Sequence, residues 1–363
     1  MGNKISILLC VIVLLTGCGT AAQLKKADRK YENGEYFAAS EIYRKNNGKI
    51  STSKQRKLKA AVNFRLAECY YNTNNHAKAV RSYTSAIRYR YNDSITYLHL
   101  AKSQLATGKL ADARKNFELY LESYPDCVEA QEGLKSVENA KALAEEFTRY
   151  QVSEAKEFNS RKNSDFCPMF MGTDAESIVF TSNRTKSKNK KINNPITGVP
   201  NNDIYTARKN NSGKWEEVEV IEGAVNSDED EGVVSFSADG KTMYFTRCPN
   251  HKKRESGCQI MKSSRSGSSW SDPVTVEITT IDSLDVVGHP TLSSDELKLI
   301  FASERKTGMG GKDLWISERE STGEKFGRPR NLGVIVNTEG DELYPYMRND
   351  STLYFASNGH GGM

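Results

Sequence analysis

The sequence predicts an α + β protein in two parts, a domain of helical repeats followed by an all-β domain. Composition changes near residue 160. Before it, Gly and Pro are scarce among Ala, Leu, Lys, Glu and Tyr; after it, short β-branched and aromatic runs alternate with Ser, Asn, Asp and Gly. Each part also repeats its own pattern, with spaced alanines in the first and four Phe-containing runs in the second. With 363 residues, 37% hydrophobic and 27% charged, the chain has the length and balance of about two globular domains.

Residues 1–17 have the pattern of a signal peptide that ends at a lipidated cysteine. Lys4 precedes an apolar run, Ile5 to Leu15, which has the length of a signal-peptide core and is too short to span a bilayer as a helix. The M-G-x-x-x-S start fits N-myristoylation, whereas Leu15-Thr16-Gly17-Cys18 resembles the bacterial lipoprotein box. The apolar run favours the lipoprotein interpretation, with an ordinary cleaved signal peptide as the alternative. We expect lipid on Cys18 and a tether over residues 18–23. Because no Asp or acidic cluster follows the cysteine, the resemblance implies a periplasm-facing anchor in the outer membrane.

Residues 24–160 are predicted to form helical hairpins. A turn residue, a buried-type Ala and an aromatic residue recur in the same order in three segments: Gly34-x-Tyr36-x-x-Ala39-x-x-x-Tyr43, Asn74-x-His76-x-x-Ala79-x-x-x-Tyr83 and Gly108-x-Leu110-x-x-Ala113-x-x-x-Phe117. Ala lets two helices approach closely, Gly or Asn makes the turn between them, and the aromatic ring fills the space against the next hairpin. The last two segments are one tetratricopeptide period of about 34 residues apart, and the region resembles that family. The resemblance implies an α-solenoid of tetratricopeptide hairpins, and we expect a capping helix over residues 140–158.

The first helix of each hairpin is expected to line a concave face that binds a peptide or a partner helix. Alignment of the repeats places seven residues on this face: Tyr31, Phe64, Glu68, Tyr71, Leu98, Lys102 and Leu105. The alternative is that the aromatic and apolar members simply pack between the helices.

Residues 161–363 are predicted to form repeated four-stranded units. Four strands end alike, in SIVFTSNR, TMYFTR, LKLIFASER and TLYFASNG, around Phe180, Phe245, Phe301 and Phe355. A polar turn precedes each, and a second strand such as NDIYTA, CQIMKS or KDLWIS follows the first three. This order is typical of a β-propeller blade, a meander repeated radially. We expect three blades and a partial fourth, an incomplete propeller in a sequence truncated at its C-terminus.

The β repeats resemble the TolB-like propeller repeats of bacterial periplasmic proteins. With the lipoprotein box and the helical repeats, the domain order resembles that of envelope lipoproteins of Bacteroidetes-type bacteria, which continue into an OmpA-like domain that binds peptidoglycan. The resemblance implies an outer-membrane adaptor that holds protein or peptide partners and links secretion or motility machinery to the cell wall. Peptidoglycan would be bound through a C-terminal domain beyond this sequence.

Two further features of the β part suggest sites. Acidic clusters precede two of the units, and Asp230, Glu231, Asp341 and Glu342 could line the mouth of a central channel, or could be turn residues exposed to water. Cys248 and Cys258 stand at facing ends of two successive strands, so a hairpin would bring them together as a disulfide. Two free thiols, or a metal pair with His251, are the alternatives.

The net charge and the sequence motifs limit the classes of function that we expect for this protein. A formal charge of +5 is mild, and the basic run from Lys186 to Lys191 has no interleaved aromatics, so no nucleic-acid partner is expected. No G-x-S-x-G, H-E-x-x-H or P-loop motif occurs, and the five histidines are scattered. We expect a non-catalytic scaffold without a cofactor or metal. The alternative is a lipoprotein hydrolase, peptidase-like, whose catalytic domain lies beyond the sequence.

Overall fold

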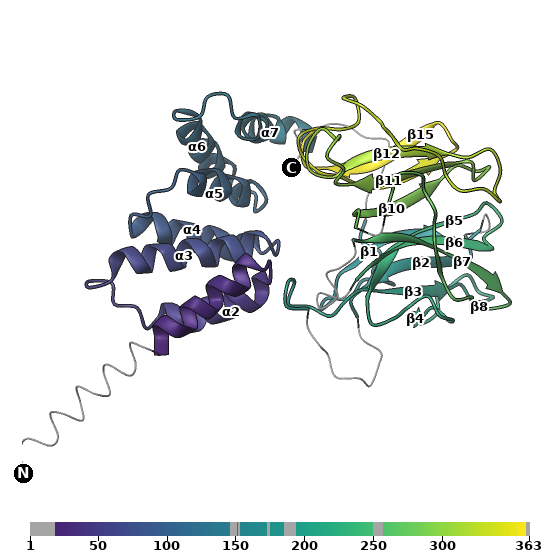
Figure 1. Cartoon of the computed structure of the whole chain (residues 1–363), viewed down its shortest axis with the longest axis horizontal. Helices are drawn as coiled ribbons and strands as arrows, with labels where there is room; N and C mark the ends of the chain where they lie inside the picture. Colours follow the sequence, from purple (N-terminus) through teal and green to yellow (C-terminus); the bar gives the residue numbers. More distant parts are fainter. Residues whose placement is uncertain are drawn as a thin grey trace, which may run out of the picture. The chain divides into compact units, whose positions relative to one another are not determined.

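The computed structural model describes residues 19–145, 151, 153–172, 175–184, 194–249, 257–282 and 284–360. The chain divides into two compact units, one of residues up to Glu145 with 193–198, and one of 146–192 with 199–362. The first is helical and the second is built of antiparallel strands (Figure 1). The predicted order, helices followed by an all-β part, is confirmed. Cys18 and the basic run at 186–191 lie outside the described residues.

The first unit is a row of helices in which each packs against the next. Its described helices are residues 19–32, α2 (Tyr36–Asn47), α3 (Arg56–Tyr71), α4 (His76–Arg88), α5 (Ile95–Leu105), α6 (Leu110–Leu121) and α7 (Val128–Glu145). Gly34, Asn74 and Gly108 adopt positive φ angles of 71°, 53° and 69° at the three turns. The alanines of the pattern are fully buried in both helices of each pair: Ala27, Ala39, Ala67, Ala79, Ala101 and Ala113. Small side chains therefore allow the close helix contacts that the repeat pattern requires.

The last helix differs from the one expected over residues 140–158. Helix α7 begins at Val128, and residues 151 and 153–160 are not helical. Ala130, Val137 and Ala140 are buried in α7, and Ala130 and Val137 pack with Phe117. The apolar residues that dock the helix thus begin at Ala130, which explains why the helix starts earlier than predicted.

Residues 194–198, although they lie far along the sequence, belong to the first unit. Pro195 and Ile196 accept hydrogen bonds at 3.0 Å from the backbone N–H groups of Ala38 and Phe37. Helix α2 has no side-chain cap, so these carbonyls satisfy N–H groups that its first turn leaves free. Gly198 has φ +80° and lies on the Phe37 ring, where a Cβ would come within 2.1 Å of a ring carbon.

The second unit consists of successive antiparallel sheets whose strands follow chain order. The first sheet holds β1 (Asp165–Phe170), β2 (Ser177–Ser182), β3 (Asp203–Arg208) and β4 (Glu219–Val220). The second holds β5 (Asp230–Phe236), β6 (Thr242–Cys248), β7 (Gln259–Ser266), β8 (Ser269–Trp270) and β9 (Val274–Thr275). The third holds β10 (Val287–Leu292), β11 (Lys298–Ser303), β12 (Asp313–Glu318) and β13 (Arg330–Asn331), and the last described sheet pairs β14 (Glu342–Arg348) with β15 (Thr352–Ser357).

Apolar layers between the sheets form the core of this unit. Strand β5 packs against β1, β2 and β3 of the first sheet, and β10 packs against β5 and β6. Phe245 lies in the layer between the first and second sheets, and Phe301 in the layer between the second and third. Phe180 instead faces away from the second sheet, beside Phe158 and Trp215. These three phenylalanines thus hold equivalent strand positions, and each is buried by an apolar layer beside its own sheet.

The first strand of every sheet carries a bulge with a left-handed residue. The register shifts in β1, β5, β10 and β14, and the residues with φ between 51° and 55° at these places are Cys167, Val233, His289 and Tyr344. The bulge turns the backbone toward the preceding sheet. Val233 N–H donates to Thr181 Oγ1 at 2.8 Å, and His289 N–H donates to Thr246 Oγ1 at 2.7 Å. These bonds offset part of the cost of a left-handed conformation in a residue other than glycine.

Candidate functional site

The candidate site is a cluster centred on the first helices of two hairpins, α3 and α5. We call it the Glu68 cluster, and it consists of Glu68 and Tyr71 of α3, Tyr83 of the second helix α4, and His99 and Lys102 of α5. Helix α3 contacts α5, and α5 contacts α7, so these helices form one continuous face. Glu68 is buried, and its Oε1 accepts a hydrogen bond from Tyr83 Oη at 2.5 Å and lies 2.8 Å from His99 Nδ1. The carboxylate thus fixes groups from two other helices.

An aromatic platform lies beside this carboxylate, which meets the edge of the His99 ring. The rings of Tyr71 and His99 stack with centroids 4.6 Å apart and planes at 8°. Lys102 Nζ lies 5.7 Å from the Tyr71 centroid and bonds to Glu129 of α7. Burial, with a contribution from the Glu68 carboxylate, raises the pKa of Tyr83, and burial raises the pKa of Tyr71. Both tyrosines therefore stay neutral at physiological pH and act as hydrogen-bonding and stacking groups.

The hydrogen bond from Tyr83 to Glu68 joins the two helices of one hairpin. An equivalent bond occurs in the preceding hairpin, and the residues that would form it are replaced in the following one. Tyr43 Oη donates to Asp28 Oδ1 at 2.5 Å, in the positions that Tyr83 and Glu68 hold in the next hairpin. In the third hairpin the acid is replaced by Lys102 and the tyrosine by Phe117, which is fully buried. Because Phe117 offers no hydroxyl, Lys102 is not used to join the two helices of its hairpin. Its ammonium lies on the face instead, where it forms an ion pair with Glu129 of α7.

At the other end of the face, Arg65 lies over the ring of Tyr31. The guanidinium carbon is 4.4 Å from the ring centroid, within the range of a cation–π contact. Arg65 forms no ion pair with a carboxylate of the described residues. Contacts therefore continue along the face from helix 19–32 through α3 and α5 to α7.

The seven residues predicted for the groove divide into two groups. Tyr31, Tyr71 and Lys102 are partly exposed on the face, and Glu68 is buried directly beneath it. Phe64 and Leu98 are buried between helices, and Leu105 is partly buried against the same core as Leu98. The structure thus gives those three the packing role that was the alternative interpretation.

Two members of the face, Arg65 and His99, are absent from the predicted set. They precede Glu68 and Lys102 by three residues in equivalent repeats, and residues three apart share a helix face. This spacing could have identified them.

The acidic residues of the β part are held by local hydrogen bonds. Glu231 and Glu342 are fully buried. The Glu231 carboxylate accepts hydrogen bonds from Ser227 and, at 2.8 Å, from Arg247. The Glu342 carboxylate accepts hydrogen bonds from Thr338 and Ser357, both at 2.6 Å. Asp230 accepts from Asn202 at 2.9 Å, and Asp341 accepts from the Lys312 backbone at 2.8 Å. Burial, followed by repulsion from Glu231 and Asp230, raises the pKa of nearby Asp203 to about 6. These contacts indicate that Glu231 and Glu342 stabilise the sheets.

A second group of reactive side chains lies at the bulges. The rings of His289 and Tyr344 stack at 4.4 Å, and Phe166, next to Cys167, meets Tyr344 edge-on at 6.2 Å. Burial raises the pKa of Cys167 to about 12 and lowers the pKa of His289 to about 4. At neutral pH the thiol is protonated and the imidazole is uncharged, so this arrangement favours packing over thiolate chemistry.

The structure joins Cys248 and Cys258 in a disulfide with a Cα separation of 4.1 Å. His251, considered as a metal partner for them, lies outside the described residues. Among the ranges described, no cluster of three or more His, Cys, Asp or Glu side chains is placed to hold a metal ion. Within those same ranges, no helix has the length and apolarity needed to cross a bilayer.

Comparisons with known proteins give only slight likenesses. No protein family and no curated protein matches the chain. Among solved structures, the first tetratricopeptide domain of Spaghetti (RPAP3) bound to an HSP90 peptide is 22% identical, with a TM-score of 0.29, and is matched over 34% of this chain and 93% of that one. TolB from Acinetobacter baumannii is 17% identical with a TM-score of 0.32, over 55% of this chain and 39% of TolB. A puromycin-hydrolysing peptidase of Mycobacterium tuberculosis is 12% identical with a TM-score of 0.34, over 54% and 28%. At these TM-scores and identities, the similarities establish neither the fold nor the function of this chain.

Proposed function

We propose that the protein is a non-catalytic adaptor that binds an extended peptide segment of a protein partner on the face of helix 19–32, α3, α5 and α7. The observation that carries this proposal is the stacked Tyr71 and His99 pair held by the buried Glu68 carboxylate. A platform fixed in this way needs little ordering when it binds, so less of the interaction free energy is lost to side-chain entropy.

The face also supplies charge for recognition. Arg65 and Lys102 place cationic groups beside the aromatic rings of Tyr31 and Tyr71. Such a surface fits a peptide with acidic and apolar side chains, since guanidinium and ammonium groups bind carboxylates and the rings cover apolar groups.

The β part is proposed to be a second rigid platform. We infer that its sheets are successive blades of a TolB-like β-propeller, because they follow chain order, share a bulge at one position and pack face to face. We further propose that Cys18 carries lipid and anchors the protein in the outer membrane, facing the periplasm. An anchored adaptor raises the effective concentration of whatever its helical face holds, as a link between a secretion or motility machine and the cell wall would require.

Affinity capture with the full chain tests the binding role. Tyr71→Ala with Lys102→Ala should reduce recovery of the partner at least tenfold, because aromatic and charged residues at the centre of a site contribute most to binding. The matched control is Lys115→Ala with Leu119→Ala, two exposed residues of α6, which should leave recovery unchanged. Equal recovery with both double variants would overturn the proposal.

A further inference from the structure

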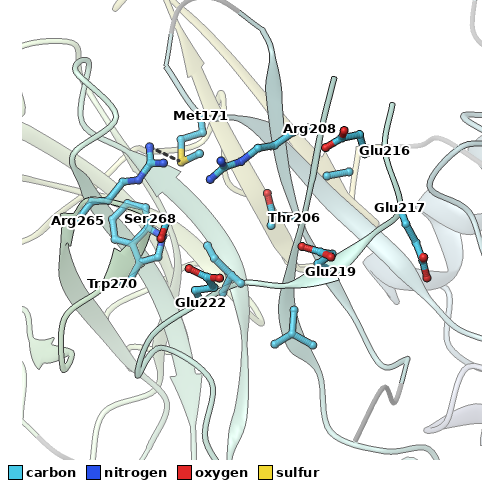
Figure 2. Close-up of a pocket in the computed structure, with 13 residues that line it drawn as sticks. Met171, Thr206, Arg208, Glu216, Glu217, Glu219, Glu222, Arg265, Ser268 and Trp270 are labelled. Atoms are coloured by element: carbon cyan, nitrogen blue, oxygen red, sulfur yellow. Dashed lines mark hydrogen bonds between the residues drawn. The ribbon is translucent and has the colours of Figure 1, made fainter. Parts of the chain in front are cut away.

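The second unit contains a pocket of about 370 Å³ between its first two sheets. It is lined by residues of β3 and β4 on one side and by Arg265 of β7, Ser268 and Trp270 of β8 on the other, with Met171 following β1. This volume lies within the range of small-molecule sites, about 300–1,000 Å³. Figure 2 shows Met171, Arg208, Arg265, Glu219 and Glu222 around a common space.

Arg265 brings unsatisfied donors to this pocket. Among the residues that the structure describes, its buried Nε has no hydrogen-bond partner, and its Nη1 donates to the Met171 sulfur at 3.6 Å. A thioether is a weak acceptor, and a guanidinium has five N–H donors, so most of its hydrogen-bonding capacity is unused. Arg208, an exposed residue of β3, directs a second guanidinium toward Met171 in the same view (Figure 2). Two planar guanidinium groups that line the same pocket are suited to bind a carboxylate through paired hydrogen bonds.

Carboxylates line another side of the pocket without neutralising these arginines. Glu219 and Glu222 lie across the space from the guanidinium groups in Figure 2, and neither forms an ion pair with any of the described residues. Glu216 and Glu217 also line the pocket, and neither Arg208 nor Arg265 forms an ion pair with a carboxylate of the described residues. Opposite charges are thus present in one pocket without being paired. A ligand that bears both an anionic and a cationic group would meet both sets.

The backbone around the acidic side is fixed before any ligand binds. Trp270 N–H donates to the Glu222 carbonyl at 3.2 Å, and Ala224 N–H donates to the Trp270 carbonyl at 3.3 Å. Gly223 between them has φ +113°, and a Cβ there would lie 2.3 Å from the Trp270 carbonyl oxygen. Only glycine fits this close approach, which holds the segment bearing Glu222 against β8.

We propose that this pocket binds a small zwitterion whose two charges are separated by a carbon chain, such as an ω-amino acid or a short peptide, with its carboxylate on Arg208 and Arg265 and its amine on Glu219 and Glu222. Trp270, Ile221 and Val220 supply apolar surface for the carbon chain between the two charges. The site lies in the β unit, so it is independent of the peptide-binding role proposed for the helical face.

A titration of the full chain with 6-aminohexanoate tests the site, followed by the NMR signal of the ¹³C-labelled Met171 methyl group. We expect saturable binding with a Kd on the order of 1 mM, as for a ligand of this size. Hexanoate and hexylamine, which each lack one charge, should bind at least tenfold more weakly. Arg265→Gln should abolish the shift, Arg208→Gln should weaken binding about tenfold, and Arg330→Gln, an exposed arginine of β13, should have no effect.

The titration also defines the results that would overturn the proposal. No shift with 6-aminohexanoate, equal binding of hexanoate, or unchanged binding after Arg208→Gln would each contradict it. Arg208 is exposed, so its variant remains informative even if Arg265→Gln fails to fold.

Discussion

Replacing Tyr83 by Phe should destabilise the helical unit by removing one hydroxyl. Tyr83 is fully buried and donates to Glu68 Oε1 at 2.5 Å. The ring that packs against Phe64 is kept, so no cavity is expected, and the loss is that of a hydrogen bond to a charged group. Such bonds contribute about 1.5–3 kcal/mol. Tyr83→Phe should therefore lower the free energy of unfolding by about that amount.

Urea unfolding of the full chain, followed by the helical circular dichroism signal, measures this loss. Tyr97→Phe is the matched control, because Tyr97 is a partly exposed tyrosine of α5 whose hydroxyl forms no hydrogen bond among the described residues. This control substitution should change the free energy of unfolding by less than about 0.5 kcal/mol. In a Glu68→Gln background the acceptor is neutral, so Tyr83→Phe should cost only about 0.5–1.5 kcal/mol. A Tyr83→Phe variant as stable as the parent, or an equal loss in both backgrounds, would refute the role given to the buried carboxylate.

Three further predictions concern the β unit. Asp203→Asn should raise the free energy of unfolding at pH 7.5 by about 1 kcal/mol, after discounting the shift for partial exposure. The pKa of Asp203, raised to about 6, means that the folded state binds the proton more tightly than the unfolded state, so the gain should fade as the pH is lowered to 4. A gain that grew with acid would contradict this prediction. Reduction of the Cys248–Cys258 bond, which spans a sequence separation of 10, should lower the free energy of unfolding by about 2–3 kcal/mol, and a Cys248→Ser, Cys258→Ser variant should lose its sensitivity to reductant. Asn337→Ala should cost about 1–3 kcal/mol, because the buried amide bonds both the N–H and the carbonyl of Leu314, at 2.8 and 3.0 Å; thermal melting would check this, with exposed Asn211→Ala as the control.

The sequence was sufficient to predict the helical hairpins because their determinants are local. Buried alanines and turn residues at fixed spacing specify helix contacts within each repeat, and Ala39, Ala79 and Ala113 are all fully buried. The capping helix was misplaced because its docking stripe, with Ala130 and Val137, lies outside the repeat pattern. The order of the β strands was likewise readable from Phe245, Phe301 and their flanking turns.

The candidate sites were less predictable because they depend on contacts between repeats. Phe64 and Leu98 share the first-helix positions of the groove, but whether such a position faces the core or the solvent depends on the helix packed beside it. The pocket at Arg265 arises where two sheets meet, and nothing near Arg265 in the sequence marks its unsatisfied guanidinium. Equally, buried Glu231 could not be distinguished from a solvent-exposed acid in the same cluster, because Arg247 reaches it only through strand pairing.

The binding role of the helical face is tested most directly by photo-crosslinking from Tyr71 in living cells. A photoreactive phenylalanine analogue would replace Tyr71 in the full chain, with the same analogue at Leu119 of α6, which is 38% exposed, as the control. Our account predicts a discrete crosslinked protein partner from position 71 that disappears with Lys102→Ala, and none from position 119. The same adduct from both positions, or no adduct from position 71, would contradict the account.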